Sequence, residues 1–579
     1  MKKISDIINN LGEGQLITRW AKEINPEKVL PEYPRPQLQR GHWLNLNGFW
    51  DYGITKRRVT ENFFYDDEIL VPFPIESLLS GVKRNLHPSE KLWYRKFFTI
   101  PKQFQGERVI IHFGAIDWES QIYINSKFVG KHIGGYTAFS FDITNFLNDG
   151  ENEIVVSVWD PTDRGVQEKG KQKLKPSLIY YTAISGIWQT VWLEFVPEKF
   201  ISNVKIIPNV DNSSIQIKLQ SNFDSIDYQT NIRVVHNKIL HAEGDFKSPD
   251  NHTLVLENQV VWTPEDPYLN DVEITILDKN GTIQDSIVSY FGMRKIKIEK
   301  DNKNIPRIFL NDKQIFQYGF LDQGYWPDGL YTAPTEEALI YDIKIAKKLG
   351  FNLLRKHVKV EPSRWYHFCD KIGMLVWQDM PSGRKFMLFG GRLEAIRKNY
   401  RKELRAMINQ LYNFPSIIMW IPFNEGWGQF KTKNITEFTK SLDQTRLINA
   451  ASGWFDKKVG DIKDIHKYPG PAIPDIENYR VAVLGEFGGL GLKIDGHIWS
   501  QNKNWSYRKA ESQKGLTQRY ENLINQLQPM ISKGLCGAVY TQLSDIEGEI
   551  NGLLTYDREI VKINEEFLQK LHEKLFREK

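Results

Sequence analysis

The stretch IFQYGFLDQGYWPDGLYTAPTEEALIYDIKIAKKLGFNLLRKHV, residues 315–358, decides the expected fold of the C-terminal half of the chain. Its two ends are apolar runs typical of buried strands, and residues 335–350 between them follow a helical pattern. Thr335 suits the start of that helix and Gly350 suits its end. The stretch therefore predicts a strand, a helix and a second strand parallel to the first.

The same alternation continues to the C-terminus. Six more apolar runs follow, with helical patterns between most of them, at 374–380, 416–425, 446–452, 461–468, 479–488 and 535–543. Eight strands that alternate with helices over residues 298–579 predict a (β/α)8 TIM barrel. A doubly wound sheet is the rival fold, but no glycine-rich phosphate loop follows the first strand, which favours the barrel.

Short alternating runs dominate the first half of the chain. Residues 1–197 hold runs such as ERVIIHFGAI (107–116) and NEIVVSVWD (152–160), separated by turn residues, and are expected to form a jelly-roll β-sandwich. Residues 198–297 hold six or seven further runs, which fits an immunoglobulin-like β-sandwich. The chain is thus expected to be multidomain, with two sandwiches before the barrel.

Composition narrows the classes of function. The 76 basic and 71 acidic residues leave a net charge of +5, too small to indicate a nucleic-acid partner. No apolar run is long enough to span a membrane, and the opening MKKISDIINNLGEG lacks the apolar core of a secretion signal. Two cysteines allow no disulfide framework. We therefore expect a cytoplasmic protein with no cofactor and no membrane partner, and leave a homo-oligomer open.

Polar residues at the ends of the predicted barrel strands point to the chemistry. Active sites of TIM barrels lie at the C-terminal ends of the strands. The fourth strand ends in Asn424-Glu425, and the seventh carries Glu486. A retaining glycoside hydrolase needs one carboxylate as nucleophile and a second as acid and then base. Glu425 and Glu486 are therefore the candidate catalytic pair.

Several motifs together resemble glycoside hydrolase family 2 over nearly the whole chain. They are SGIWQTVWLE (185–194), VWTPEDPYL (261–269), YFGMRKI (290–296), NFPSIIMWIPFNEGWG (413–428) and VLGEFGG (483–489). The resemblance implies an N-terminal sugar-binding domain, an immunoglobulin-like domain and a catalytic barrel. It also implies a retaining, exo-acting enzyme whose partner is an oligosaccharide or glycoside.

The resemblance assigns roles to individual residues. Glu486 would be the nucleophile and Glu425 the acid/base. Asn424 would hold the 2-hydroxyl of the sugar, Arg355 would orient the nucleophile, and Tyr468 would donate a hydrogen bond to it. For Arg355 and Tyr468 the competing interpretation is an ordinary rim contact or packing.

Further strand-end residues are candidates for binding the sugar. His357 and His466 could bond hydroxyl groups, and Trp326 could stack on a sugar face, although structural roles are almost equally expected for all three. The remaining candidates are Asp322, Gln323, Asp379, Trp427 and Tyr540. No histidine follows VWQDMP on the third strand, unlike the magnesium-binding β-galactosidases of the family, so no metal site is expected.

The sugar itself stays open between templates. The β-glucuronidases of the family bind the substrate carboxylate with an Asn-x-Lys, where this chain has Asn551 flanked by Glu547 and Glu549. A neutral sugar is therefore expected, a β-galactoside or α-L-arabinopyranoside, and a glucuronide should be rejected. Arg355, Lys356 and Lys359 are the counter-evidence, because any of them could supply the missing cation.

Other functions compete with this one. A β-mannosidase and a β-glucuronidase remain alternatives within the family, and a transglycosylase would use the same glycosyl-enzyme with a sugar acceptor. A catalytically dead carbohydrate-binding protein is the alternative outside enzymes. The presence of both glutamates together with Asn424 argues against it.

Overall fold

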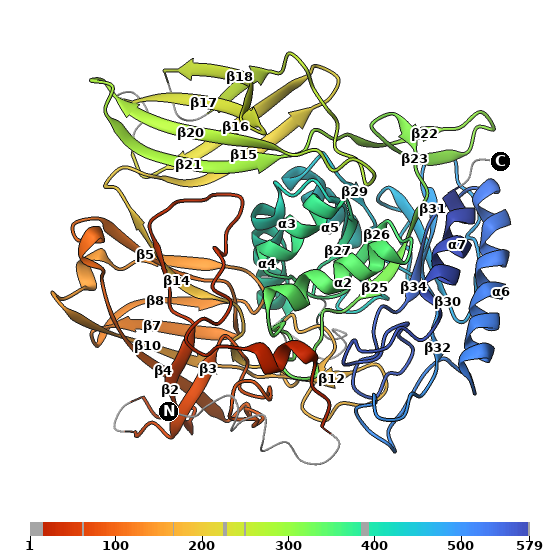
Figure 1. The fold of residues 1–579 in the computed structure, drawn as a ribbon, viewed down its shortest axis with the longest axis horizontal. Coiled ribbons are helices and arrows are strands. Elements are labelled where there is room, and N and C mark those ends of the chain that lie inside the picture. The colour runs from red at the N-terminus through yellow and green to blue at the C-terminus, as the bar shows by residue number, and fades with distance from the viewer. Residues whose placement is uncertain are drawn as a thin grey trace.

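The computed structural model describes residues 15–60, 63–165, 167–223, 228–247, 251–381, 383 and 393–576. The N-terminal sandwich lies beside the barrel, at the lower left of Figure 1, and the second sandwich lies at the top of the same view. The expected fold class, two β-sandwiches and a TIM barrel, is confirmed. The opening segment, residues 1–14, on which the expectation about a secretion signal depends, lies outside the described residues.

Two antiparallel sheets face each other in the N-terminal sandwich. One holds, in spatial order, β1 (Trp43–Asn45), β14 (Val191–Val196), β5 (Arg108–Phe113) and β9 (Phe139–Asp142). The other holds β3 (Asp67–Val71), β2 (Gly48–Lys56), β4 (Glu90–Thr99), β10 (Glu151–Trp159), β7 (Glu119–Ile124) and β8 (Lys127–Ile133). Alternate apolar residues of both sheets, such as Ile122, Ile154 and Leu193, fill the space between them.

The second sandwich is smaller. Its sheets are β15 (Ile201–Asn209), β16 (Ser214–Ser221) and β19 (Asn251–Val255), against β18 (Ile239–Phe246), β17 (Tyr228–His236), β20 (Asn270–Asp278) and β21 (Ile283–Phe291). A three-stranded sheet leads from it into the barrel: β22 (Ile296–Lys300), β23 (Pro306–Leu310) and β24 (Lys313–Gln314).

All eight predicted barrel strands are present and parallel. They are β25 (Gln317–Asp322), β26 (Leu353–Lys356), β27 (Leu375–Asp379), β28 (Ile417–Ile421), β29 (Leu447–Ile448), β30 (Ile462–Lys467), β31 (Val481–Gly488) and β34 (Leu535–Thr541). Strand β34 pairs with both β31 and β25, so the first and last barrel strands of the chain lie side by side, and β29 and β30 are the two edges of the eight-stranded sheet. This order brings the ends of β28 and β31 to one rim.

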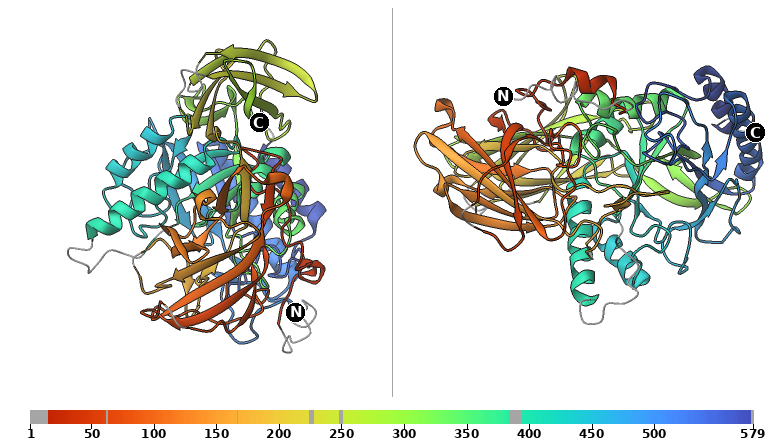
Figure 2. Two further views of the ribbon diagram at one scale, coloured as in Figure 1. Left: turned by 90° about the vertical axis from the view of Figure 1, so that its left-hand side faces the viewer. Right: turned by 90° about the horizontal axis from the view of Figure 1, so that it is seen from below.

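Helices cover the outside of the barrel. They are α2 (Glu336–Lys348), α3 (Ser363–Ile372), α4 (Leu393–Leu411), α5 (Thr432–Leu442), α6 (Gln513–Ser532) and α7 (Glu565–Phe576). The predicted ends of α2 are confirmed, because the Thr335 side chain accepts from the Ala338 N–H and Gly350 has a φ of +86°. Helices α4 and α5 project from the body of the molecule (Figure 2). Among the described residues, no helix is both long and apolar enough to cross a membrane.

Short elements join the N-terminal sandwich to the barrel. Within the segment between β10 and β14, β11 (Gln172–Lys173) pairs with β12 (Tyr181–Thr182), and β13 (Gly186–Ile187) pairs with β6 (Ile116–Asp117). Residues 15–42, called the N-terminal strap below, precede β1 and contain the short helix η1 (Arg19–Glu23). The short helices η2 (Lys102–Phe104) and η3 (Thr144–Phe146) lie in loops of the N-terminal sandwich. Near the C-terminus, β32 (Leu490–Gly491) pairs with β33 (Arg508–Lys509).

Candidate active site

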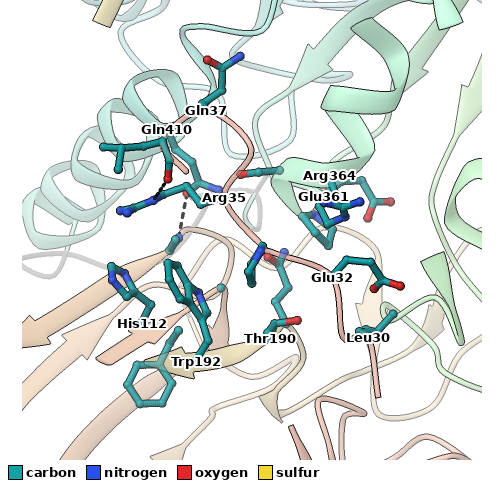
Figure 3. A pocket seen from close by; sticks show the side chains of 18 of the residues that line it. Leu30, Glu32, Arg35, Gln37, His112, Thr190, Trp192, Glu361, Arg364 and Gln410 are labelled. Atoms are coloured by element: carbon teal, nitrogen blue, oxygen red, sulfur yellow. Dashed lines mark hydrogen bonds between the residues drawn. The ribbon is translucent and has the colours of Figure 1, made fainter. Parts of the chain in front are cut away.

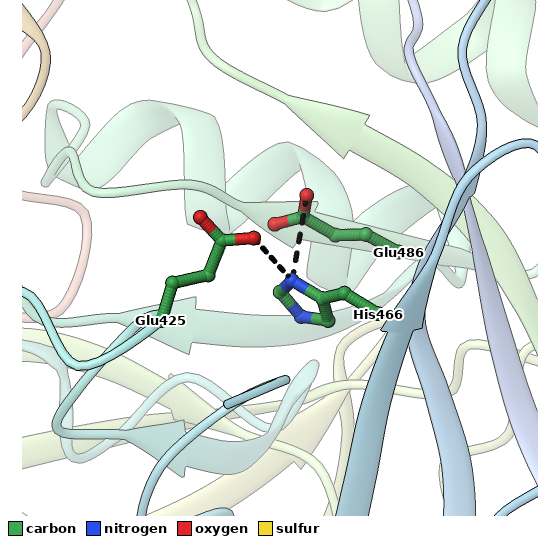
Figure 4. A group of neighbouring side chains, drawn as sticks. All are labelled: Glu425, His466 and Glu486. Atoms are coloured by element: carbon green, nitrogen blue, oxygen red, sulfur yellow. Dashed lines mark hydrogen bonds and ion pairs between the residues drawn. The ribbon is translucent and has the colours of Figure 1, made fainter. Parts of the chain in front are cut away.

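The two candidate catalytic glutamates lie side by side at the barrel rim. Glu425 follows β28 and Glu486 lies near the end of β31. One oxygen of each lies within 4.8 Å of the other and of a His466 ring nitrogen (Figure 4). The backbone of Glu425 has a φ of +49°, and its N–H donates to the Ser452 carbonyl. The close pair fits the carboxylate spacing of about 5–5.5 Å found in retaining glycosidases.

His466 bridges the two carboxylates. Its Nδ1 lies 2.8 Å from Glu425 Oε1 and 3.7 Å from Glu486 Oε2. Its Nε2 lies 2.9 Å from the Ser452 hydroxyl, whose own proton goes to Asp464. Nδ1 therefore faces a carboxylate, whereas Nε2 lies between the Ser452 hydroxyl and the Arg355 guanidinium, whose Nη1 is 3.4 Å away. Burial lowers the pKa of His466, but the negative charges of Glu486, Asp464 and Glu425 outweigh it and raise the pKa above its ordinary value.

Glu486 lies among positive charges. Arg355 Nη1 donates to Glu486 Oε1 at 3.2 Å, and the Tyr468 hydroxyl donates to Oε2. Burial raises the pKa of Glu486, but His466, Arg355, His357 and Lys171 together lower it to about 2. The carboxylate is therefore ionised across the physiological range, as a nucleophile must be.

Arg355 joins four parts of the rim. Its guanidinium is fully buried and contacts both oxygens of Asp379 at 3.1 Å, the Gly485 carbonyl at 3.1 Å and Asn424 Oδ1 at 2.8 Å. His357 Nδ1 lies 2.7 Å from Asp379 Oδ2, and burial, with the charge of Lys171 next, lowers the pKa of His357. Asp379 thus holds Arg355 and His357 beside Glu486.

A glycine is required immediately before Glu486. A Cβ on Gly485 would lie 2.3 Å from Asp464 Oδ2. The Asp464 carboxylate uses this space to accept from the Gly485 N–H at 2.7 Å, and it also accepts from Ser452 and Asn449. The GEFG sequence therefore lets one buried carboxylate fix the strand that carries Glu486.

A chain of amides reaches the rim from the first strand. Gln323 Nε2 donates to Gln542 at 2.6 Å, Gln542 donates to Asn551 at 2.8 Å, and Asn551 donates to Glu549 at 3.1 Å. Gln323 is thus linked to the loop after β34 through Gln542.

Trp427 is half-buried, and its ring stacks on Tyr180 of the N-terminal sandwich at 5.9 Å.

Three of the predicted sugar-binding residues lie away from the two glutamates. Trp326 is buried against Trp20 of the N-terminal strap and lies under the Arg558 guanidinium, so it is a packing residue. The Tyr540 ring packs edge-on against Tyr520 of α6, on the outer side of the barrel. Side chains of a strand alternate in direction, so the next residue, Thr541, faces the rim and contacts Tyr468.

Asp322 is the third predicted binding residue that lies away from the two glutamates. Its carboxylate binds Lys356 Nζ at 2.7 Å, and that ammonium also binds Glu361 and lies over the Trp365 ring of α3. Lys359 binds Glu361 at 2.9 Å. Lys356 and Lys359 are thus both held by carboxylates on the outer side of the barrel, and Asp322 with them. Neither Lys356 nor Lys359 is therefore free to replace the lysine of the glucuronidase Asn-x-Lys motif.

Lys171 was missed by the sequence analysis. It belongs to the N-terminal sandwich, yet it is one of the charges that lower the pKa of Glu486. No motif or spacing in GKQKLKP (170–176) indicates that contact, because it arises only when the sandwich docks on the barrel. Lys171 also acts on Glu549, so it is a cation near the Asn551 loop that the sequence analysis did not name among the possible replacements for the glucuronidase lysine.

The cluster of Glu425, His466 and Glu486 has the geometry of a candidate metal site. The fit is poor, because both oxygens of Glu486 already accept hydrogen bonds from Arg355 and Tyr468, and the Arg355 guanidinium would place a positive charge beside the ion. A separate cavity of about 200 Å³ lies where the strap, both sandwiches and α3 meet, and Arg35, Trp192 and Arg364 are among its lining residues (Figure 3). It contains none of the candidate catalytic or binding residues.

Comparison with known families identifies the class. Three models match in order: "Glycosyl hydrolases family 2, sugar binding domain" at residues 64–197, "Glycosyl hydrolases family 2" at 199–294, and "Glycosyl hydrolases family 2, TIM barrel domain" at 303–484. The chain belongs to glycosyl hydrolase family 2. The barrel match covers Glu425 and ends two residues before Glu486.

Curated relatives divide between two activities. A putative beta-glucuronidase of Formosa agariphila is 28% identical over 344 residues, covering 58% of this chain and 39% of the relative. A beta-galactosidase of Thermoanaerobacter pseudethanolicus is 29% identical over 384 residues, covering 61% and 47%. This chain therefore spans less than half the length of these two relatives.

Solved structures with the same fold are similar over nearly their whole length. A beta-D-glucuronidase of Dictyoglomus thermophilum superposes with a TM-score of 0.75 at 20% identity, covering 94% of this chain and all of that one. A β-glucuronidase from Ruminococcus gnavus in complex with D-glucuronic acid gives a TM-score of 0.72 at 18% identity, with the same coverage. At this identity the likeness establishes the fold alone.

Proposed function

We propose that this chain is a retaining, exo-acting β-glycoside hydrolase that uses Glu486 as nucleophile and Glu425 as acid/base. The observation that carries the proposal is the close carboxylate pair, whose oxygens approach within 4.8 Å at the barrel rim. The two environments differ as the two roles require. Glu486 contacts Arg355 and Tyr468, which stabilise its anion, whereas Glu425 contacts the proton-bearing His466.

The reaction would proceed in two displacements. Glu486 attacks the anomeric carbon, the bond to the leaving oxygen breaks, and Glu425 gives that oxygen a proton. The product of this step is a covalent glycosyl-enzyme of inverted configuration. Glu425 then takes a proton from water, which attacks the same carbon and releases Glu486. The second inversion restores the original configuration.

Neighbouring residues support each step. Arg355 and Tyr468 hold Glu486 in one orientation, and Arg355 also fixes Asn424, whose amide would bond the sugar's 2-hydroxyl. His466 lies on the hydrogen bond to Glu425 and can exchange its Nδ1 proton with that carboxylate. His357, Gln323 and Trp427 remain candidates for sugar contacts around the pair.

Two terminal sugars compete. The sequence favours a neutral one, a β-galactoside or α-L-arabinopyranoside, because the Asn-x-Lys of glucuronidases is absent. A β-glucuronide is the second candidate, and the specific observation in its favour is the cation Lys171 near the nucleophile. Glu547, one of the two carboxylates expected to repel an acidic sugar, accepts from the Thr182 N–H and is thereby turned to the N-terminal sandwich.

Azide rescue tests the assignment of the two glutamates. Glu486→Ala should lose about 10⁴-fold or more in kcat on nitrophenyl glycosides, and azide should restore turnover with an azide product of inverted configuration. Glu425→Ala should lose far less on the dinitrophenyl glycoside, whose leaving group needs no proton, than on a methyl glycoside. An azide product of retained configuration from Glu486→Ala would refute the nucleophile.

A further inference from the structure

A segment of the N-terminal sandwich lies against the loop that follows β26. Gly170 has a φ of +58°, and a Cβ there would lie 2.9 Å from the Val358 carbonyl oxygen. Val358 directly follows His357, whose Nδ1 contacts Asp379. Because Gly170 has no side chain, the segment approaches this loop closely, and the next residue, Lys171, is brought to the rim.

A second contact fixes the same segment to the loop after β34. The Lys171 carbonyl accepts from the Tyr181 N–H at 3.2 Å. The next residue of that strand, Thr182, donates its N–H to both oxygens of Glu547, at 3.1 and 3.2 Å. Glu547 stands two residues before Glu549. Lys171 is therefore held between the loops that follow β26 and β34.

The Lys171 ammonium is buried with no anion of its own. The residue is 6% exposed, and within the described ranges its side chain has no hydrogen-bond or ion-pair partner. Burial raises the pKa of Glu549, and the charge of Lys171 is the largest opposing influence. The same charge acts on Glu486 and His357. The ammonium thus lies close to the nucleophile and to Glu549 without pairing with either.

Three other buried lysines among the described residues are each paired with a carboxylate. Lys356 binds Asp322 and Glu361, Lys359 binds Glu361, and Lys562 binds both oxygens of Asp545. Taking an ammonium out of water without a partner is unfavourable, so an unpaired one beside a site calls for an anion from outside the chain.

We infer that Lys171 contacts the substrate and receives the carboxylate of a terminal uronic acid, so that the N-terminal sandwich selects acidic over neutral sugars. This inference rests on the proposed function. A uronic acid carries its carboxylate on C5, across the ring oxygen from the anomeric carbon. With C1 at Glu486, the carboxylate lies at the same buried rim, where a charge-assisted hydrogen bond to the ammonium is strong.

A purely supporting role for Lys171 is the competing explanation. Glu486 already receives direct hydrogen bonds from Arg355 and Tyr468, which hold it in place and ionised. A supporting cation would matter equally for every sugar. A substrate-contacting cation matters mainly for the sugar whose carboxylate it pairs, because a hydroxymethyl group in the same place leaves the ammonium unpaired.

The test compares kcat/KM for 4-nitrophenyl β-glucuronide and β-galactoside in four forms of the full chain. The unaltered protein should prefer the glucuronide. Lys171→Met should lose about 100-fold or more on the glucuronide and far less on the galactoside, as expected for one partner of a desolvated charge pair. Lys171→Arg should keep the preference, and Lys175→Met, an exposed lysine of the same segment, should match the unaltered protein.

Two results would overturn the inference: a preference of the unaltered protein for the galactoside, or equal losses on both substrates in Lys171→Met. Thermal unfolding of each variant separates loss of folding from loss of recognition, and Lys171→Arg keeps the comparison usable if Lys171→Met unfolds. Failure of the proposed function would look different, because no form would then hydrolyse either glycoside.

Discussion

The barrel and the N-terminal sandwich contribute differently to the same candidate site. The barrel supplies both carboxylates and a cation, Arg355, that is bonded to Asp379, Asn424 and Glu486. The sandwich supplies a cation, Lys171, that has no partner among the described residues. A cation already engaged by the protein serves the reaction on every substrate, whereas an unengaged one is available to a substrate's own charge. Arg355 is therefore expected to serve catalysis, and Lys171 to serve recognition of the substrate.

Removing the barrel cation should have the largest effect. Arg355→Met leaves Asp379 and Glu486 without their shared partner, and we expect about a 1,000-fold loss of kcat/KM on acidic and neutral sugars alike. Because Arg355 helps to lower the pKa of Glu486, the acid limb of the pH profile should move to higher pH. Arg355→Lys, which keeps the charge, should lose less and move the limb less.

If Arg355→Met lost kcat/KM on only one of the two sugars, the different roles assigned to Arg355 and Lys171 would be wrong. Thermal unfolding is the necessary control, because removing one member of a buried ionic network destabilises a fold by about 3–5 kcal/mol. An unmoved acid limb in a folded Arg355→Met protein would show that other charges determine the ionisation of Glu486.

Removing the bridging imidazole should have a smaller effect. His466→Asn keeps a hydrogen-bond donor for Glu425 but loses the charge, and we expect about a tenfold loss of kcat/KM. In the unaltered protein, activity should fall when His466 loses its proton, at a pH above the ordinary imidazole value because neighbouring carboxylates raise its pKa. That basic limb should be absent or displaced in His466→Asn. An unchanged limb would exclude His466 as its source.

The sequence predicts the barrel well, for a physical reason. Every barrel strand except β30 is buried along its whole length, so most of them form apolar runs, and Thr335 and Gly350 mark the ends of α2 by local chemistry alone. The ends of strands in a barrel meet at one rim, so Glu425 and Glu486 could be paired from their positions. These features depend on short segments and on one general rule of the fold.

The errors have a different origin. Tyr540 and Asp322 stand at strand ends, but their side chains point to the outer layer, where Tyr520 and Lys356 receive them. A shift of one residue along a strand reverses the direction of the side chain, and spacing alone does not fix that register. Lys171 was missed because its place at the rim depends on docking between two domains.

The measurement that tests the central claim most directly is capture of the glycosyl-enzyme. A 2-deoxy-2-fluoro glycoside with a good leaving group slows both steps, the second more than the first, so that the covalent intermediate accumulates. Peptide mass spectrometry of the inactivated protein should find one sugar, attached to Glu486. A sugar on any other residue, or turnover with inverted product and no covalent intermediate, would contradict the account.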